Sequence, residues 1–319
     1  MEVDSARAVN ARESPGEPHT RRKLGRPRLL IIGCGDVGLR IVSRLAARFR
    51  IVALTSRPAR VPLLRAVGVV PVVGNLDQRG SLRRLRGLAT RVLHLAPPGQ
   101  SQLVDMRTRG LAAALAGAVQ RAVYVSTTGV YGDHGGLRID ETARLRPTSE
   151  RAQRRVDAER TVRRRWRGTV LRVPGIYGHD RLPLERLREQ LPALSDADDV
   201  YSNHIHAEDL ARICITALQR GAAARVYNAV DDDPLKIAEY LDVVADATGL
   251  PRPPRMPRAQ LKAVVSPMMY SFMSESRRLE NRRLKRELRF RLHYPTVAVA
   301  LQRPAENKNG PGGSSQRSR

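Results

Sequence analysis

Three glycines near the start of the chain have the spacing of a phosphate-binding turn. In the stretch LLIIGCGDVGLRIV, Gly33, Gly35 and Gly38 follow an apolar run and open an amphipathic one. In such a strand–turn–helix the first glycine permits a tight turn, the second lets a pyrophosphate approach the backbone, and the third lets the helix pack on the strand. The amides of Asp36, Val37 and Gly38 would then point at the phosphates from the helix start. The segment therefore predicts a dinucleotide site.

The end of the next apolar run, IVALT, indicates which dinucleotide is bound. An NAD site carries an acidic residue about 20 positions after the glycines, where it binds the ribose hydroxyls. Here Thr55 is followed by Ser56 and Arg57, with no carboxylate nearby. These side chains are expected to hold the 2′-phosphate of NADP, Arg57 through charge-assisted hydrogen bonds. NADP is therefore favoured; NAD is the alternative, since Arg57 could be incidental in so arginine-rich a chain.

The elements that must position these residues are strands alternating with helices. The strand-like runs are RLLIIG, IVALT, VVPVVG, RVLHLA, AVYVST and GTVLRV. Alternation predicts an α/β fold with a doubly wound parallel sheet, and continuously apolar strands predict that helices cover both faces. We expect a Rossmann core at 28–178, completed by 204–249, and a small C-terminal α/β substrate lobe from 179–203 and 250–302. In that lobe Leu279, Leu284 and Leu288 have helical spacing.

The net charge of +26 raises the question of a nucleic-acid partner. Such a charge increases non-specific affinity for phosphate polymers. However, arginines are spread over nearly every segment and aromatic residues make up only 4% of the chain. No basic motif with stacking rings of the RRM type occurs. We interpret the charge as a general preference for arginine codons and expect no specific nucleic-acid partner.

The chain also lacks sequence signals for a membrane or an export pathway. No run of eighteen apolar residues occurs, so no membrane span is expected. The first residues have no apolar signal region. Cys34 and Cys214 lie far apart without metal-type spacing, which fits a reducing cytosol. We expect a cytoplasmic protein with disordered polar tails at 1–27 and 303–319; a homodimer is left open.

Four sequence blocks resemble the short-chain dehydrogenase/reductase superfamily, in its extended, nucleotide-sugar epimerase/dehydratase-like branch. The blocks are GCGDVG, AVYVSTTGVYG, LRVPGIYG and NHIHAEDLAR, and their ordered spacing covers nearly all of residues 28–302. The resemblance implies a Rossmann domain that binds NAD(P) and a C-terminal lobe that selects a small-molecule substrate.

The resemblance also implies roles for residues that follow the third and fourth strands. Asn75 and Leu76 match the loop that contacts adenine, although Asp is usual at position 75. An asparagine can still accept a hydrogen bond from the adenine amino group. Ala96 and Pro97, in HLAPP, match the loop that lines the inner ribose of the cofactor.

Further matches lie at the ends of the fifth and sixth strands. Thr127, three residues before VYG, matches the Ser/Thr that polarises the substrate oxygen in this superfamily. Pro174, Gly175 and Ile176 match the loop that borders the nicotinamide. These residues are expected to surround the site of hydride transfer.

The catalytic tyrosine and lysine of the superfamily are both missing. Alignment on VYG places the expected Tyr at Arg151 and the expected Lys, four residues on, at Arg155. In the family the phenol exchanges a proton with the substrate oxygen, and the lysine tunes its pKa. Arg151 cannot replace it, because arginine essentially never deprotonates near neutral pH. Arg155 could still bind ribose or phosphate oxygens. The chain thus resembles an atypical member of the superfamily.

Two other groups of residues have both a chemical and a structural interpretation. Tyr131 and Tyr177 sit in glycine-flanked turns, where they are either proton donors or packing residues; Tyr131 is the weak candidate for the missing acid. His204 and His206 alternate on a strand and could bind a metal. A structural role at the lobe junction is favoured for the histidines, and no metal is expected.

We therefore expect an NAD(P)-dependent oxidoreductase or epimerase/dehydratase that acts on a hydroxyl or carbonyl substrate, with sugar-nucleotide-like compounds among the candidates. Thr127 would polarise the oxygen and Arg155 would orient the cofactor. The alternative is a catalytically inactive sensor or regulator that uses the dinucleotide as a ligand, which the missing Tyr/Lys pair favours.

Overall fold

The computed structural model describes residues 25–100 and 102–303. Apart from residues 25–27 and 303, the tails expected to be disordered lie outside the described part of the chain. Within that part, no helix is long and apolar enough to cross a membrane.

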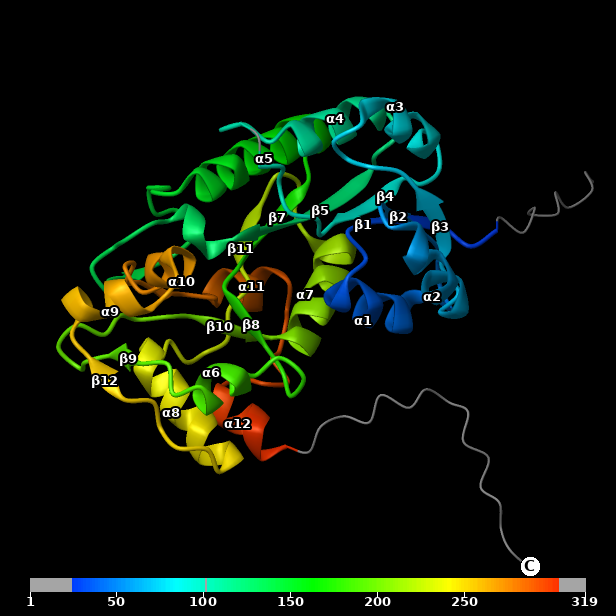
Figure 1. The fold of residues 1–319 in the computed structure, drawn as a ribbon. Helices are drawn as coiled ribbons and strands as arrows, with labels where there is room; N and C mark the ends of the chain where they lie inside the picture. The colour runs from blue at the N-terminus through cyan, green and yellow to red at the C-terminus, as the bar shows by residue number, and fades with distance from the viewer. Residues whose placement is uncertain (1–24, 101, 304–319) are drawn as a thin grey trace, which may run out of the picture.

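Seven parallel strands form the central sheet, in the order β11-β7-β5-β4-β1-β2-β3 (Figure 1). The strands are β1 (Arg28–Ile32), β2 (Arg50–Thr55), β3 (Val70–Val73), β4 (Arg91–His94), β5 (Arg121–Thr127), β7 (Thr169–Val173) and β11 (Val226–Asn228). The chain order reverses between β1 and β4, which pair in parallel from Leu29↔Arg91 to Ile32↔His94. Such a switch point opens a crevice at the carboxyl ends of the strands, where ligands bind in folds of this kind.

Helices cover both faces of the sheet, as the continuously apolar strands predict. One face carries α1 (Asp36–Leu45), α2 (Val61–Ala66), α7 (Ala207–Arg220) and α11 (Arg282–Glu287), and the other carries α3 (Arg79–Leu82), α4 (Met106–Ala114) and α5 (Glu150–Trp166). Along β1, Leu29 and Ile31 face the first layer, while Leu30 and Ile32 face the second; all four are fully buried. The predicted α/β doubly wound fold is confirmed.

The remaining elements form a smaller unit at one end of the sheet (Figure 1). Three two-stranded parallel ladders join β8 (Gly175–Tyr177) to β10 (His204–His206), β9 (Ala193–Leu194) to β12 (Arg255–Met256), and β6 (Arg138–Ile139) to β13 (Arg278–Leu279). The helices are α6 (Leu184–Arg188), α8 (Ile237–Thr248), α9 (Arg258–Val264), α10 (Pro267–Phe272) and α12 (Val297–Gln302). The α8 helix packs on α6 and β9 through Leu241 and Leu187.

One local expectation is wrong in this region. Leu279, expected on a helix with Leu284 and Leu288, lies instead in β13 and pairs with Ile139 of β6. The helix starts later, at Arg282, and its Leu284 packs into the main core. A partner strand from a distant part of the chain thus overrides the local spacing.

Candidate functional site: two cavities at the carboxyl edge of the sheet

The turn after β1 has the geometry that a phosphate loop requires. Gly33 has φ +85°, and a Cβ there would lie 2.6 Å from the backbone nitrogen of Ala96, so no other residue fits. A Cβ on Gly38 would lie 3.2 Å from Cys34 Sγ, which shows how closely the helix packs on the turn. At Gly35, by contrast, a Cβ would meet nothing within 4 Å. The loop is therefore tightly packed on two sides and open at Gly35, where a pyrophosphate would approach.

The start of α1 supplies hydrogen-bond donors to this open side. The first helical backbone bond runs from Leu39 N to Gly35 O at 2.9 Å, so the amides of Asp36, Val37 and Gly38 precede the bonded turns. The helix dipole adds partial positive charge at the same place. The carboxylate of Asp36 accepts instead from Arg40 at 3.1 Å, and from Arg181. The backbone of Asp36, rather than its side chain, is thus suited to a phosphate.

A cavity of about 420 Å³ extends from this turn to the end of β2. It is lined by Gly33, Gly35, Ser56, Arg57, Ala96 and Pro97, among others. Arg60, which was not singled out from the sequence, lines it as well, one turn after Arg57. Two guanidinium groups therefore flank the position where the ribose 2′-oxygen of a bound dinucleotide is expected. Burial raises the pKa of the Cys34 thiol, in the same wall, to about 11, so this side chain is a neutral packing residue.

Asn75 and Leu76 lie near this cavity but are not among its lining residues. The Asn75 side-chain oxygen accepts from the amide of Asp77 at 3.0 Å, and Leu76 packs on the core. The carboxylate of Asp77 receives two hydrogen bonds from Arg107, at 2.6 and 2.7 Å. Arg107 also donates to Pro97 O at 3.4 Å. This guanidinium holds together the two loops that the resemblance assigns to adenine and ribose.

A second cavity, of about 410 Å³, lies at the ends of β5 and β7; we call it the reaction cavity. Thr127, Pro174 and Gly175 all line it, whereas Ile176 continues into β8. Thr127 Oγ1 accepts a hydrogen bond from the amide of Gly129 at 3.2 Å. An oxygen held in this way keeps its own hydrogen for donation. The Thr127 hydroxyl is therefore suited to donate to an oxygen of a molecule bound beside Pro174 and Gly175.

Both arginines at the expected Tyr and Lys positions line the reaction cavity. Arg155 Nη1 donates to Val125 O at 2.6 Å and to Tyr124 Oη at 3.0 Å, so it is anchored to β5. The guanidinium of Arg151 stacks on the ring of Phe272, 4.8 Å from its centroid. Arg277 and Glu275 also line the cavity and pair with each other at 2.7 Å. The lining therefore holds an excess of positive charge.

The tyrosines are placed in three different environments. Tyr131 is fully buried, donates to Asn228 Oδ1 at 2.7 Å and lies outside the lining of the reaction cavity. Burial raises its pKa to about 12. Tyr177 is also buried, among His204 and His206. This placement favours the packing interpretation for both. Tyr201, which was not singled out from the sequence, does line the reaction cavity.

His204 and His206 both pack against aromatic rings at the lobe junction. His204 stacks on Tyr240, with ring centroids 4.1 Å apart, and His206 lies 3.8 Å from the ring of Tyr294. Burial lowers the pKa of both rings to about 4. Among the described residues, no group of three or more His, Cys, Asp or Glu is placed to hold a metal ion.

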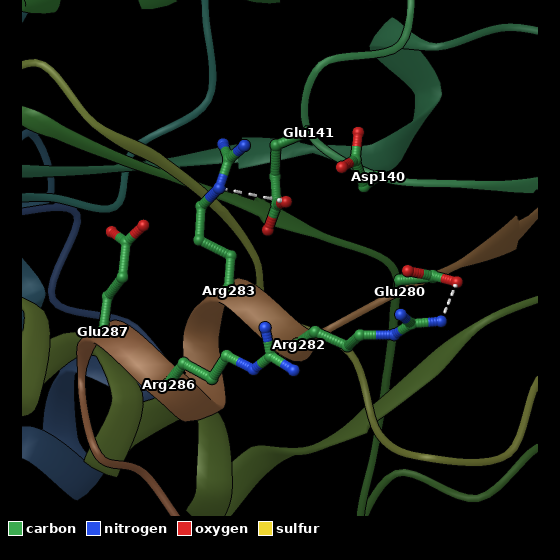
Figure 2. A pocket seen from close by; sticks show the side chains of 7 residues that line it. All are labelled: Asp140, Glu141, Glu280, Arg282, Arg283, Arg286 and Glu287. Atoms are coloured by element: carbon green, nitrogen blue, oxygen red, sulfur yellow. Dashed lines mark hydrogen bonds and ion pairs between the residues drawn. The ribbon is translucent and has the colours of Figure 1, made fainter.

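A further pocket, shown in Figure 2, is lined by charged side chains that largely neutralise one another. Glu141 pairs with Arg283 at 3.4 Å and Glu280 with Arg282 at 2.9 Å. It shares no lining residue with the two cavities above. We interpret it as an ion-pair surface rather than a ligand site.

The phosphate turn at the switch point of a parallel sheet defines a Rossmann-type dinucleotide-binding protein. The family model described as NAD(P)H-binding matches residues 33–221, and the chain belongs to this family. Its superfamily is the short-chain dehydrogenases/reductases, in the epimerase/dehydratase-like branch, which confirms the resemblance read from the sequence.

Individual relatives agree with this assignment. A ketoreductase of Stigmatella aurantiaca, named for 4-hydroxy-2-methyl-3-oxo-4-farnesyl-3,4-dihydroquinoline-1-oxide, is 25% identical over 240 residues, which are 68% of this chain and 72% of that protein. The structure of a functionally unknown conserved protein from Silicibacter pomeroyi is 30% identical, with a TM-score of 0.71, over 86% of this chain and 96% of that one. The UDP-glucose 4-epimerase of Thermotoga maritima shares the fold at 16% identity, with a TM-score of 0.69, over 86% and 96% of the two chains.

Proposed function

We propose that this protein is an NADP(H)-dependent oxidoreductase that reduces a ketone to a secondary alcohol. The observation that carries the proposal is the reaction cavity itself. It combines the Thr127 hydroxyl, the Pro174–Gly175 segment and an excess of arginine at the carboxyl edge of the sheet. Bound NADPH supplies a hydride to the carbonyl carbon. One proton must then reach the carbonyl oxygen, so that the ketone, NADPH and H⁺ give the alcohol and NADP⁺.

The side chains of the reaction cavity fit the charge that such a reaction develops. As hydride adds, the carbonyl oxygen becomes an alkoxide, and donors aimed at it stabilise the transition state. Thr127 donates one hydrogen bond, and the nearby guanidinium groups of Arg151 and Arg155 favour negative charge. We propose Tyr201 as the group that delivers the proton, because it is the phenol among the described lining residues. The name of the Stigmatella relative also refers to reduction of a ketone.

The Thr127 hydroxyl is the first test of this proposal. Replacing Thr127 by Val, which has nearly the same shape, removes the donor to the developing alkoxide. We expect kcat/KM for ketone reduction to fall about 100-fold, the lower range for loss of one such donor, while the Kd for NADPH is unchanged. Thr127→Ser, which restores a hydroxyl, should recover most of the rate. Equal rates for Thr127→Val and wild type would contradict the assigned role.

The preference for NADP is tested at the two arginines of the first cavity. Arg57→Ala and Arg60→Ala each remove a donor to the 2′-phosphate, worth about 1.5–3 kcal/mol for a charged hydrogen bond. Each should weaken NADPH binding roughly 10- to 100-fold and leave NADH binding unchanged, as measured by titration calorimetry. Arg65→Ala, an exposed arginine on α2 outside the cavity lining, is the matched control. Equal losses of affinity for NADPH and for NADH would contradict the preference for NADP.

A second candidate function is a dinucleotide sensor without catalysis. One observation favours it: Arg151, at the expected proton-donor position, stacks on Phe272 of the lobe instead of facing a base. Such a sensor would bind NADPH tightly and oxidise it with none of a broad panel of ketones and aldehydes, in wild type and Thr127→Val alike.

A further inference from the structure

A third cavity, of about 450 Å³, lies in the lobe beside the reaction cavity; we call it the lobe cavity. Its wall is mostly apolar and includes Pro183, Ile237, Tyr240, Leu241, Met269 and Met273. These six side chains come from α8, from α10 and the residue after it, and from the segment before α6. Methionine side chains are flexible and polarisable, and they adapt to apolar ligands of varied shape.

The lobe cavity adjoins the reaction cavity. Ser202, Ile237 and Phe272 line both of them. Phe272 is 54% exposed although it is a large apolar side chain, and Arg151 stacks on it from the α5 side. A substrate whose carbonyl lies beside Thr127 would therefore reach the lobe cavity by extending past the exposed ring of Phe272.

The polar groups of the lobe cavity carry little charge. His204 lines it, stacks on Tyr240, and is neutral at pH 7 because burial lowers its pKa to about 4. Arg186 is the one charged side chain among the described lining residues, and its Nη2 already donates to Pro192 O at 3.0 Å. A nucleoside diphosphate requires several cationic or amide donors around its phosphates. The lining offers far fewer than that, and most of its surface suits hydrocarbon.

We propose that the lobe cavity binds an apolar, alkyl- or prenyl-like substituent of the substrate while the ketone lies in the reaction cavity. The proposal rests on the ketone reduction inferred above, and it names the substrate class as ketones bearing a hydrocarbon chain. Burial of each additional methylene group then contributes to transition-state binding until the cavity is filled.

Linear methyl ketones of increasing chain length test this directly on the wild-type protein. We expect kcat/KM for NADPH oxidation to rise about fourfold per methylene group over the first additions and then to level off. In Met269→Trp, which fills part of the lobe cavity, the rise should stop at a shorter chain. In this variant, kcat/KM for the longest ketones should fall more than about tenfold, while kcat/KM for the shortest ketones stays at the wild-type value. Val264→Trp, at a 51% exposed position on neighbouring α9 outside the cavity lining, is the matched control.

A binding assay separates this proposal from the proposed reaction. Displacement of the apolar dye Nile red from the NADPH-loaded protein by long-chain methyl ketones measures the lobe cavity without turnover. If no ketone is reduced but long chains displace the dye, and Met269→Trp weakens this, ketone reduction is overturned and the apolar site stands. If ketones are reduced with no dependence on chain length, or if UDP-glucose displaces the dye more effectively than the ketones, the apolar site is overturned.

Discussion

Gly35→Ala is expected to weaken NADPH binding by at least about 100-fold while the free energy of unfolding changes by less than about 1 kcal/mol. A methyl group at this position meets nothing within 4 Å, so the folded chain accommodates it. The same methyl group occupies the space through which the pyrophosphate reaches the amides at the start of α1. Loss of one or two charge-assisted hydrogen bonds, each about 1.5–3 kcal/mol, accounts for the expected change. Titration calorimetry and urea unfolding measure the two quantities.

Substitutions at two other glycines serve as controls for Gly35→Ala. Gly80→Ala also adds a methyl group where nothing lies within 4 Å, on α3 and outside the cavity lining, and it should bind NADPH normally. Gly33→Ala should lose binding for a different reason, since its Cβ would lie 2.6 Å from Ala96 N and its φ is +85°. That variant should also lose stability. Normal NADPH affinity in Gly35→Ala would show that the cofactor does not lie on this turn.

Glu159→Ala is expected to remove about 3–5 kcal/mol of stability, the cost of leaving one partner of a buried ion pair unpaired. Arg172 Nη2 lies 2.8 Å from Glu159 Oε2, and the two side chains are only 4% and 3% exposed. Ser126 Oγ donates to the same carboxylate at 2.6 Å. Removing the Glu159 carboxylate leaves the guanidinium of Arg172, on β7, buried without its carboxylate partner. Because small proteins are stable by about 5–15 kcal/mol in total, urea unfolding should show a large shift of the midpoint.

An ion pair on the same helix whose carboxylate is exposed is the matched control. Glu150 is 70% exposed and pairs with Arg154 one turn along α5; Arg154 is buried but also donates to Gln102 O at 3.1 Å. Pairs with one partner in water contribute about 0–1 kcal/mol, and Arg154 keeps its backbone acceptor, so Glu150→Ala should change the unfolding midpoint little. Similar losses of stability for Glu150→Ala and Glu159→Ala would mean that the buried carboxylate contributes no more to stability than the exposed one.

The parts of the site that follow a strand directly could be predicted from the sequence. Gly33 and Gly35 are recognisable because steric limits on the turn restrict the residue type and the spacing. Thr127 and Pro174 could be placed at the same edge because parallel strands end together. Arg60 was not singled out, although one helical turn after Arg57 is a distance from which a side chain can reach the same ligand.

The parts of the site that the lobe contributes could not be predicted. Tyr201 and Phe272 reach the reaction cavity because β13 pairs with β6 and α10 folds against α5, and such contacts leave no local pattern. Leu279 shows the same limit, since its helical spacing gives way to pairing with a distant strand. The apolar character of the lobe cavity likewise depends on side chains of α8 and α10 that line it together although they are far apart in the sequence.

The most direct test of the central proposal is to trace the hydride from NADPH into the alcohol product. NADPH deuterated at the transferable nicotinamide position is incubated with the protein and a long-chain methyl ketone, and the alcohol is analysed by mass spectrometry. We predict one deuterium at the carbinol carbon, formed by wild type and about 100-fold more slowly by Thr127→Val. Tight NADPH binding with no deuterated alcohol from any ketone tested would contradict ketone reduction and leave the protein as a dinucleotide sensor.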